Sequence, residues 1–421
     1  MIKIDVYDGS GADIFIRRVQ DNPEVTATVA NILADVKVRG DEAVREYTAK
    51  FDGCDMPSFE VSAKEWEEGA AQCDRQLYKV MEEAAANIAD FHIRQIPQGF
   101  EVEKEDGIIL GQKVSPLERV GIYVPGGTAA YPSTVLMNAV PAKIAGVKEI
   151  IMVTPAKKGG IKPEILAAAE IAGVTAIFKV GGAQAIGALA YGTKSIPRVD
   201  KITGPGNIYV ATAKKLVFGL TDIDMIAGPS EILVLADGTA SAARVAADML
   251  SQAEHDVLAS AVLVTSCARL AEETAAELER QIPLLLRADI ARKSIEGQGR
   301  IILVDDISQA ADIANALAPE HLEVYTAEPF KLLPLLKNAG SIFLGGYTPE
   351  PVGDYFAGPN HTLPTSGTAR FSSPLSGADF VKRSSYIYYT KEALKKSGEK
   401  IMAFAMSEGL QAHANAIKVR L

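Results

Sequence analysis

Short apolar runs alternate with helical stretches over much of this chain, starting at about residue 118. A strand, a helix and another strand in this order form a parallel sheet that helices cover on both faces. The pattern occurs as two series, divided near residue 236, and predicts an α/β fold with two doubly wound (Rossmann-like) parallel-sheet units. The first series has expected strands at 120–124, 149–153, 176–180 and 200–203. The second has them at 231–235, 261–264, 301–304, 322–325 and 341–344.

A helical N-terminal region precedes these two series. A helix is expected to open at Asn22-Pro23, because proline is favoured in the first turn. A second helix should run over about 63–93, with Val80 and Met81 inside it and charged residues mainly outside. The apolar face of the first helix consists of Val29, Ile32, Leu33 and Val36.

Two smaller elements complete the expected fold. Residues 100–114 alternate between polar and apolar, which predicts a β-hairpin with its turn at Asp106-Gly107. The segment from about residue 376 is a separate, small C-terminal helical tail, with helix expected over 391–414. These elements lie outside both alternating series, so they should form structure of their own.

Composition excludes several classes of protein. The net charge of −10 argues against broad nucleic-acid binding, which needs a basic face. No apolar run approaches the length of a membrane span, and the N-terminus lacks a signal-peptide pattern. Cys54, Cys73 and Cys267 are too widely spaced for a disulfide framework, which indicates a reducing compartment. We therefore expect a soluble, cytoplasmic protein that acts on a small polar molecule.

Histidine is scarce, with five residues in 421, and four of them lie beside carboxylates or an amide. Imidazole, carboxylate and carbonyl oxygen together are what a divalent metal of borderline character binds. They also serve general acid–base chemistry near neutral pH. The sequence therefore predicts a metal-dependent enzyme. The four stretches are Gln252 to His255, Glu320-His321, Asp354 to His361, and Glu408 to His413.

Gln252 and His255 lie three residues apart near the end of an expected helix, so both side chains can converge on one ion. The alternative is an ordinary polar helix end. A structural zinc site prefers cysteine, so a metal held partly by glutamine would be catalytic or substrate-binding. Glu320 and His321 lie between a helix and a strand, which we interpret as a carboxyl-side loop of the sheet, where such folds place their chemistry. The alternative is a helix-terminal charge pair.

The segment 345–376 is rich in glycine and proline and has no regular pattern. Long loops of this kind in compact domains are usually functional. Asp354 within it is a candidate metal ligand, with an Asx-turn as the alternative. His413 taken alone would be a surface histidine, and His92 is interpreted as structural.

Three glycine turns follow expected strands of the first series, at Gly126-Gly127, Gly181-Gly182 and Gly204 to Gly206. Glycine allows backbone N–H groups to approach a phosphate at a helix N-terminus. The standard dinucleotide fingerprint is absent, because Tyr209 stands where its third glycine would be. The turns are compatible with a dinucleotide and equally with plain tight turns.

Taken together, these stretches resemble the histidinol dehydrogenase family, which carries out the last two steps of histidine synthesis. The resemblance covers nearly the whole chain. The stretches that carry it are ERVGIYVPGGTAAYPST, VGGAQAIGALAYGT, ITGPGNIYVATAK, AGPSEILVLAD, DMLSQAEHD, APEHLE, GDYFAGPNHTLPT, TARFSSPLS and EGLQAHANA.

The resemblance implies a zinc- and NAD-dependent oxidation of L-histidinol through L-histidinal to L-histidine. It implies His321 as the proton acceptor and Glu320 as the group that activates water. The implied zinc ligands are Gln252, His255, Asp354 and His413, the last from the other subunit of a homodimer. The implied substrate contacts are the four zinc ligands and His321, together with Ser230, His361 and Glu408. Glu408 would also come from the partner. The implied NAD contacts are Tyr123, Gln184 and Asn207.

The family's arrangement implies a division of the chain into four parts. Residues 1–17 would be an N-terminal arm. Residues 18–122 with 236–375 would form the first α/β domain, with the metal and catalytic residues and with the N-terminal helices packed on it. Residues 123–235 would form an inserted α/β domain for NAD, and residues 376–421 a tail that reaches the partner.

Three other functions remain open at this point. A dehydrogenase on the same scaffold could act on another polar alcohol, as do relatives that resemble sulfopropanediol dehydrogenase, although Glu408 favours a cationic substrate. A zinc hydrolase could use Glu320 without NAD, but the glycine turns argue against it. A non-catalytic, metal-stabilised assembly protein would leave Glu320 and His321 without a task.

Overall fold

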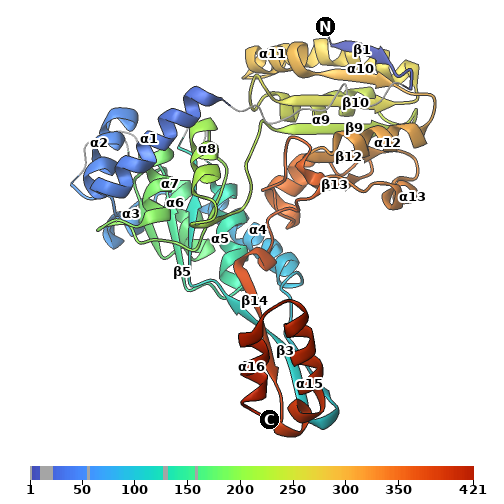
Figure 1. Ribbon diagram of the computed structural model, residues 1–421. Coiled ribbons are helices and arrows are strands. Elements are labelled where there is room, and N and C mark those ends of the chain that lie inside the picture. Colours follow the sequence, from blue (N-terminus) through green and yellow to red (C-terminus); the bar gives the residue numbers. More distant parts are fainter. Residues whose placement is uncertain (1, 10–21, 55–56, 127–130, 157–159) are drawn as a thin grey trace.

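Two parallel sheets dominate the computed structural model (Figure 1), which describes residues 2–9, 22–54, 57–126, 131–156 and 160–421. Every strand pair within these two sheets is parallel, which confirms the predicted pair of doubly wound units. Sheet A has the order β1 (Lys3–Val6), β11 (Arg300–Leu303), β10 (Ser260–Thr265), β9 (Glu231–Ala236), β12 (His321–Tyr325), β13 (Ser341–Leu344). Sheet B has the order β6 (Ala176–Phe178), β5 (Glu149–Val153), β4 (Arg119–Tyr123), β7 (Lys201–Thr203), β8 (Asp222–Ile223).

Sheet A is buried on both faces, as its uninterrupted apolar strands require. Along β9, Ile232 and Val234 pack under one layer of helices, and Leu233 and Leu235 pack under the other. The first layer is α9 (Ala242–Ala253), α10 (Ala268–Gln281) and α11 (Ala288–Gln298). The second is α12 (Ile307–Leu317), with α13 (Pro329–Leu332) at its end. The strand order reverses between β9 and β12, which makes this the switch point of the sheet.

Sheet B reverses its strand order between β4 and β7. Each long connection between its strands is a helix, and the glycine-containing segments after β6 and β7 lead into α7 and α8. The helices are α5 (Pro132–Ile144), α6 (Pro163–Ala172), α7 (Gly182–Tyr191) and α8 (Ile208–Val217).

The N-terminal helices cover sheet B, whereas we expected them to pack with the second α/β unit. Helices α1 (Pro23–Arg39) and α2 (Asp41–Asp52) contact α7, and α3 (Ala63–Ala70) and α4 (Arg75–Ile93) contact α6. The reason is that α7 is apolar on its outer side as well, where Gly187 lies close against Leu33 and Val36 on the apolar face of α1. In sheet A only β1 comes from the N-terminal region.

Details of the sequence prediction differ for two elements, the helix over 63–93 and strand β9. The predicted face of α1 is buried. The helix predicted over 63–93 is instead interrupted between α3 and α4. Within α4, Val80 is exposed while Met81 is buried. Strand β9 pairs with β10 and β12, so it belongs to sheet A as the second series predicts, although the implied domain division places residues 123–235 in the inserted domain. No helix in the described part of the chain is long and apolar enough to cross a membrane.

The predicted hairpin forms the core of an arm that projects from the two units (Figure 1). Strands β2 (Phe100–Lys104) and β3 (Ile108–Pro116) pair antiparallel, with Asp106 in the left-handed region at φ 63°. Strand β14 (Val381–Tyr388), which we did not predict, pairs with β3. Helices α15 (Lys391–Ser407) and α16 (Gln411–Lys418) pack together on this sheet and confirm the helical tail.

The segment 345–376 is built from short helical turns, although its sequence shows no regular pattern. It contains α14 (Glu350–Val352) and a π-helical turn, η5 (Gly353–Ala357). Asn87 Nδ2 on α4 donates to the carbonyl of Phe356 at 2.9 Å. Asn360 Nδ2 donates to the carbonyl of Met137 on α5 at 2.6 Å. This loop follows sheet A and is fastened to helices of sheet B, so it connects the two units.

Candidate functional site

The predicted catalytic pair lies at the amino-terminal edge of sheet A. His321 is the first residue of β12 and pairs in register with Ile232 of β9 and Ser341 of β13. Gln252 lies in the last turn of α9, which returns to the same edge, and Ser230 immediately precedes β9. Our placement of Glu320 and His321 at a carboxyl-side loop is therefore wrong. A helix-to-strand connection in a parallel sheet delivers its residues to the amino ends of the strands.

His321 is held in one orientation by the backbone of the neighbouring strand. Its Nδ1 lies 3.0 Å from the carbonyl oxygen of Glu231 and 3.3 Å from Nε2 of the buried Gln252. Because a carbonyl only accepts hydrogen bonds, the shorter contact places the proton of a neutral His321 on Nδ1 and the lone pair on Nε2, and the amide nitrogen of Gln252 then makes no hydrogen bond to Nδ1. Nε2 lies 3.6 Å from Oδ1 of Asp354 and has no hydrogen-bond partner in the described structure.

Carboxylates surround this imidazole. Burial alone would lower the pKa of His321, but Glu320 and Asp354 raise it to about 10. Burial opposes ionisation of Asp354 as well, yet His321 and His361 hold the pKa of that carboxyl well below its usual range. His361 Nδ1 lies 4.0 Å from Oδ2 of Asp354. The loop 345–376 thus brings Asp354 against His321 and His361 against Asp354.

Glu320 is a buried carboxyl group with an altered acidity. Burial raises its pKa to about 7, and a hydrogen bond from the N–H of Glu231 to Oε2, at 2.9 Å, opposes the shift. A carboxyl that titrates near neutral pH can both accept and release a proton during turnover. Its Oε2 is 3.7 Å from Nδ1 of His321, so the two predicted catalytic groups are direct neighbours.

Glu350 completes this centre, and we did not predict it. His321, Glu350 and Asp354 each offer one ligand atom, and these atoms lie within 4.8 Å of one another. Burial and the nearby Asp354 raise the pKa of Glu350 to about 8. The sequence held a signal, because Glu350 and Asp354 are four residues apart and therefore share one face of a helical turn.

A second acidic pair, Glu323 and Asp248, contacts the start of the loop 345–376. Glu323 on β12 accepts the N–H of Glu350 at 2.7 Å and shares a hydrogen bond with Asp248 on α9. Burial raises the pKa of Glu323 to about 9 and that of Asp248 to about 6. Two carboxyl groups share a hydrogen bond only when one of them keeps its proton. The pair joins α9, β12 and α14, the elements that carry Gln252, His321 and Glu350.

The remaining predicted metal and substrate residues divide into two groups. His255 follows α9 and is exposed, within range of electrostatic interaction with Asp354. Glu408 and His413 are exposed on the arm, where α16 lies at the opposite end of the molecule from α9 and β12 (Figure 1). A single chain therefore does not bring His413 to Gln252, His255 and Asp354.

The predicted NAD residues gather in sheet B, near the carboxyl ends of its strands. Tyr123 ends β4 and is buried. Asn207 is the exposed N-cap of α8, and its Oδ1 accepts the N–H groups of Tyr209 and Val210. Gln184 in the first turn of α7 is buried, and neither atom of its amide has a hydrogen-bond partner in the described structure. These residues flank the switch point between β4 and β7, where such sheets bind ligands.

The glycine turn before α7 differs from a phosphate-binding turn. The N–H of Gly182 donates to the hydroxyl of Tyr123 at 3.1 Å. The N–H of Gly181 donates to the carboxyl of Asp52 on α2, whose pKa burial raises. These two donors already have partners within the chain, so neither is available to a phosphate.

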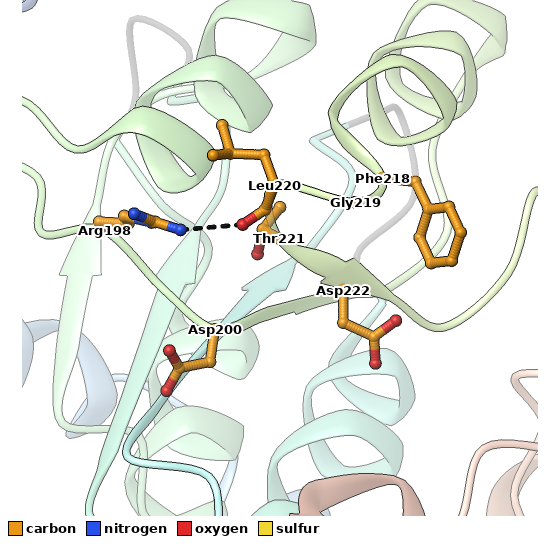
Figure 2. A pocket seen from close by; sticks show the side chains of 7 residues that line it. All are labelled: Arg198, Asp200, Phe218, Gly219, Leu220, Thr221 and Asp222. Carbon is orange, nitrogen blue, oxygen red and sulfur yellow. Dashed lines mark hydrogen bonds between the residues drawn. The ribbon is translucent and has the colours of Figure 1, made fainter. Parts of the chain in front are cut away.

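A depression of about 220 Å³ lies elsewhere, at the amino-terminal edge of sheet B near β8 (Figure 2). Asp200 and Asp222 lie in its wall, and Arg198 donates to the carbonyl of Leu220 at 2.9 Å. No predicted site residue lines it, so we assign the functional site to the edge of sheet A.

The fold and this centre define an α/β enzyme in which an imidazole lies between buried carboxyl groups. Residues 16–421 match the family model for histidinol dehydrogenase. The chain therefore belongs to the histidinol dehydrogenase family and is an oxidoreductase.

Individual relatives agree with this assignment. The histidinol dehydrogenase of Geobacillus kaustophilus is 57% identical over 399 residues, covering 94% of each chain. That of Clostridium acetobutylicum is 54% identical over 405 residues, covering 96% of this chain and 94% of the relative. The crystal structure of histidinol dehydrogenase from Elizabethkingia anophelis superposes with a TM-score of 0.95 at 38% identity, covering 100% of this chain and 98% of the other.

Proposed function

We propose that this enzyme oxidises L-histidinol through L-histidinal to L-histidine, with zinc and NAD. The observation that supports this most directly is the position of His321 between Glu320 and Asp354, beside Gln252. The first step needs a base for an alcohol proton, and the second needs a group that activates water. His321 and Glu320 are adjacent and chemically suited to these two tasks.

The donor set fits a zinc ion. Imidazole nitrogen together with carboxylate and amide oxygen are ligands that zinc accepts, and the absence of cysteine is typical of a catalytic centre. In this proposal Gln252, His255 and Asp354 hold the ion together with His413 of a second copy. Bound zinc would orient the amine and imidazole of the substrate and balance the charge of Asp354. Glu350 would support Asp354 from behind through their hydrogen bond.

His321 acts in the proposal as the proton acceptor. Its Nδ1 is committed to the carbonyl of Glu231, so only Nε2 is available for the substrate hydroxyl. Without the metal, Glu320 and Asp354 raise the pKa of His321 to about 10 and keep the imidazole protonated, so it would accept the alcohol proton only once bound zinc balances the charge of Asp354. Glu320 removes a proton from water as the aldehyde is hydrated, and its raised pKa suits a group that must exchange protons near pH 7.

NAD accepts one hydride in each oxidation, and we place it at the switch point of sheet B. Tyr123, Gln184 and Asn207 are its proposed contacts. The unpaired amide of Gln184 supports this assignment, because a buried amide without partners is costly unless a ligand completes its hydrogen bonds. The loop 345–376 connects this region to the edge of sheet A, so substrate and dinucleotide can meet between the two units.

A homodimer would complete the centre. Hydrophobic side chains on the projecting arm are strongly exposed, among them Phe100, Ile387 and Phe404 at 58%, 71% and 70%. Exposed apolar clusters of this kind are typical of interfaces. Glu408 and His413 are exposed on the same arm, so a second copy that covers the arm could receive both residues at its own sheet A edge.

The proposal is tested by NADH formation from L-histidinol and NAD with the purified dimer, before and after chelation and zinc restoration. Two NADH per histidinol, lost on chelation and regained with zinc, are expected. A folded, zinc-loaded dimer that does not turn over histidinol would contradict the proposal. A dehydrogenase for another polar alcohol, such as a sulfonated diol, would then be tested with a panel of alcohols.

A further inference from the structure

A buried ion pair lies directly beneath the glycine turn that follows β7. Lys214 on α8 and Asp224, just after β8, form this pair, and their side chains are 2% and 1% exposed. Charges removed from water in this way are expensive, and replacing such a pair by apolar residues is often neutral or stabilising. Stability alone therefore does not explain why this pair is buried.

Both members of the pair bind the backbone of a single residue, Gly204. Oδ2 of Asp224 accepts the N–H of Gly204 at 2.8 Å. Nζ of Lys214 donates to the carbonyl of Gly204 at 2.9 Å. The other oxygen of Asp224 accepts the N–H of Met225 at 2.6 Å, so its carboxylate is fully engaged. The ion pair thus binds both the N–H and the carbonyl of Gly204.

Gly204 has no freedom to move away from this position. Its φ of 108° lies in a region that favours glycine. A Cβ on this residue would approach the carbonyl oxygen of Tyr123 on β4 to 2.2 Å. The turn is therefore packed against β4 on one side and held by the ion pair on the other, at the switch point of sheet B.

We propose that Lys214 and Asp224 are positioning residues for the dinucleotide, acting through Gly204 to place the turn 204–206 and Asn207. This inference rests on the proposed function. Asn207 begins α8 three residues after Gly204, and Lys214 belongs to the same helix. The ion pair therefore fixes the turn relative to the helix that the turn leads into, which sets the position of Asn207 and of the first N–H groups of α8.

The test compares single and double variants of the pair in the full-length dimer. Lys214→Met and Asp224→Asn each leave one buried charge unpaired, so both should lower the melting temperature and weaken NAD binding. The double variant Lys214→Met/Asp224→Asn removes both charges, so its melting temperature should return close to that of the wild type. Its dissociation constant for NAD should stay raised by about tenfold, because the carbonyl of Gly204 has lost its donor. The KM for histidinol should change by less than about twofold, since sheet A is untouched.

Lys201→Met is the matched control. Lys201 on β7 pairs with Asp222 on β8 at 2.8 Å, is buried, and joins the same two strands without binding the backbone of the turn. We expect normal NAD binding in this variant. Normal NAD binding in a stable double variant would overturn the inference, as would an equal loss in Lys201→Met. Failure of the proposed function is recognised separately, because a wild-type dimer would then bind no NAD or leave histidinol unoxidised.

Discussion

Nδ1 of His321 lies 3.0 Å from the backbone carbonyl oxygen of Glu231, so the register of two adjacent strands determines which nitrogen of this imidazole is left for a substrate. The carbonyl belongs to the first residue of β9 and the imidazole to the first residue of β12. Since a backbone carbonyl cannot rotate away from its sheet, the assignment of the proton to Nδ1 is built into the fold. Nε2 lies 3.6 Å from Oδ1 of Asp354 and is the atom that we propose as the base.

Replacing His321 by asparagine should lower kcat for histidinol by about 10²- to 10⁴-fold, because the alcohol proton loses its acceptor. Histidinol binding should change little.

His361→Asn should instead raise the KM for histidinol more than it lowers kcat, since His361 contacts Asp354 and not the catalytic pair. Steady-state kinetics of the two variants will check this difference. A loss of less than tenfold in His321→Asn would rule out the assigned role.

Replacing Glu320 by glutamine should impair the conversion of histidinal to histidine more than that of histidinol to histidinal. Glutamine keeps an oxygen for the N–H of Glu231 and has nearly the same shape, but it cannot take a proton from water. Stopped-flow NADH formation from histidinol and from histidinal measures the two halves separately. Equal losses in both halves would contradict the division of labour between Glu320 and His321.

Two inactive variants should restore activity when they are combined in one dimer. Gln252→Ala and His413→Ala each remove one ligand, and in a shared site the two ligands come from different subunits. A heterodimer then has one site with both defects and one intact site. Random mixing should therefore recover about a quarter of wild-type activity. Measurement after co-refolding of the two variants checks this, and no recovery would mean that each site is built by one chain.

The stability of the protein should fall in mild acid through His92, which is fully buried on α4. Burial lowers the pKa of His92 from 6.5 to about 4. A group whose folded-state pKa is depressed in this way favours the folded state fully above pH 6.5, and this contribution is lost as the pH falls toward 4. The loss amounts to about 3 kcal/mol. His92→Gln, which does not titrate, should show a smaller fall in melting temperature between pH 7 and pH 4.5. An identical fall in both proteins would contradict the prediction.

The acidic pair beneath the loop should tolerate an amide but not a truncation. Glu323→Gln keeps an acceptor for the N–H of Glu350 and a donor for Asp248, so the free energy of unfolding should stay within about 0.5 kcal/mol of the wild type. Glu323→Ala removes both and should cost about 1–3 kcal/mol. Denaturant titrations of the two variants check this, and equal stabilities would show that the carboxyl pair is dispensable.

The period of the hydrophobic pattern predicted the strands and helices of both sheets well, because that period is a local property of the chain. It did not predict which helices pack together. The apolar face of α1 is readable in the sequence, but its partner is α7, which needs covering on its outer side. Strand β14 was missed for a related reason, since it is exposed along nearly its whole length and has no buried face to mark it.

The residue types of the site could also be predicted, since imidazoles beside carboxylates are rare enough to be noticed. The edge of the sheet on which they lie was interpreted wrongly for Glu320 and His321, and Glu350 was overlooked. Its carboxyl group lies beside His321 because Glu323 on β12, two residues after His321, binds the N–H of Glu350. That contact is between residues distant in the sequence, and the spacing of Glu350 from Asp354 was its one local signal.

The sequence by itself determined the class of fold, the elements of both units and the chemistry of the side chains, since each depends on neighbouring residues and on side-chain type. The tertiary structure alone decided that His321, Glu350 and Asp354 come together at the amino edge of sheet A and that Nδ1 of His321 faces the carbonyl of Glu231. It also decided that the arm carries His413 away from its own site. These properties depend on strand order, register and helix packing, which are set by contacts between distant parts of the chain.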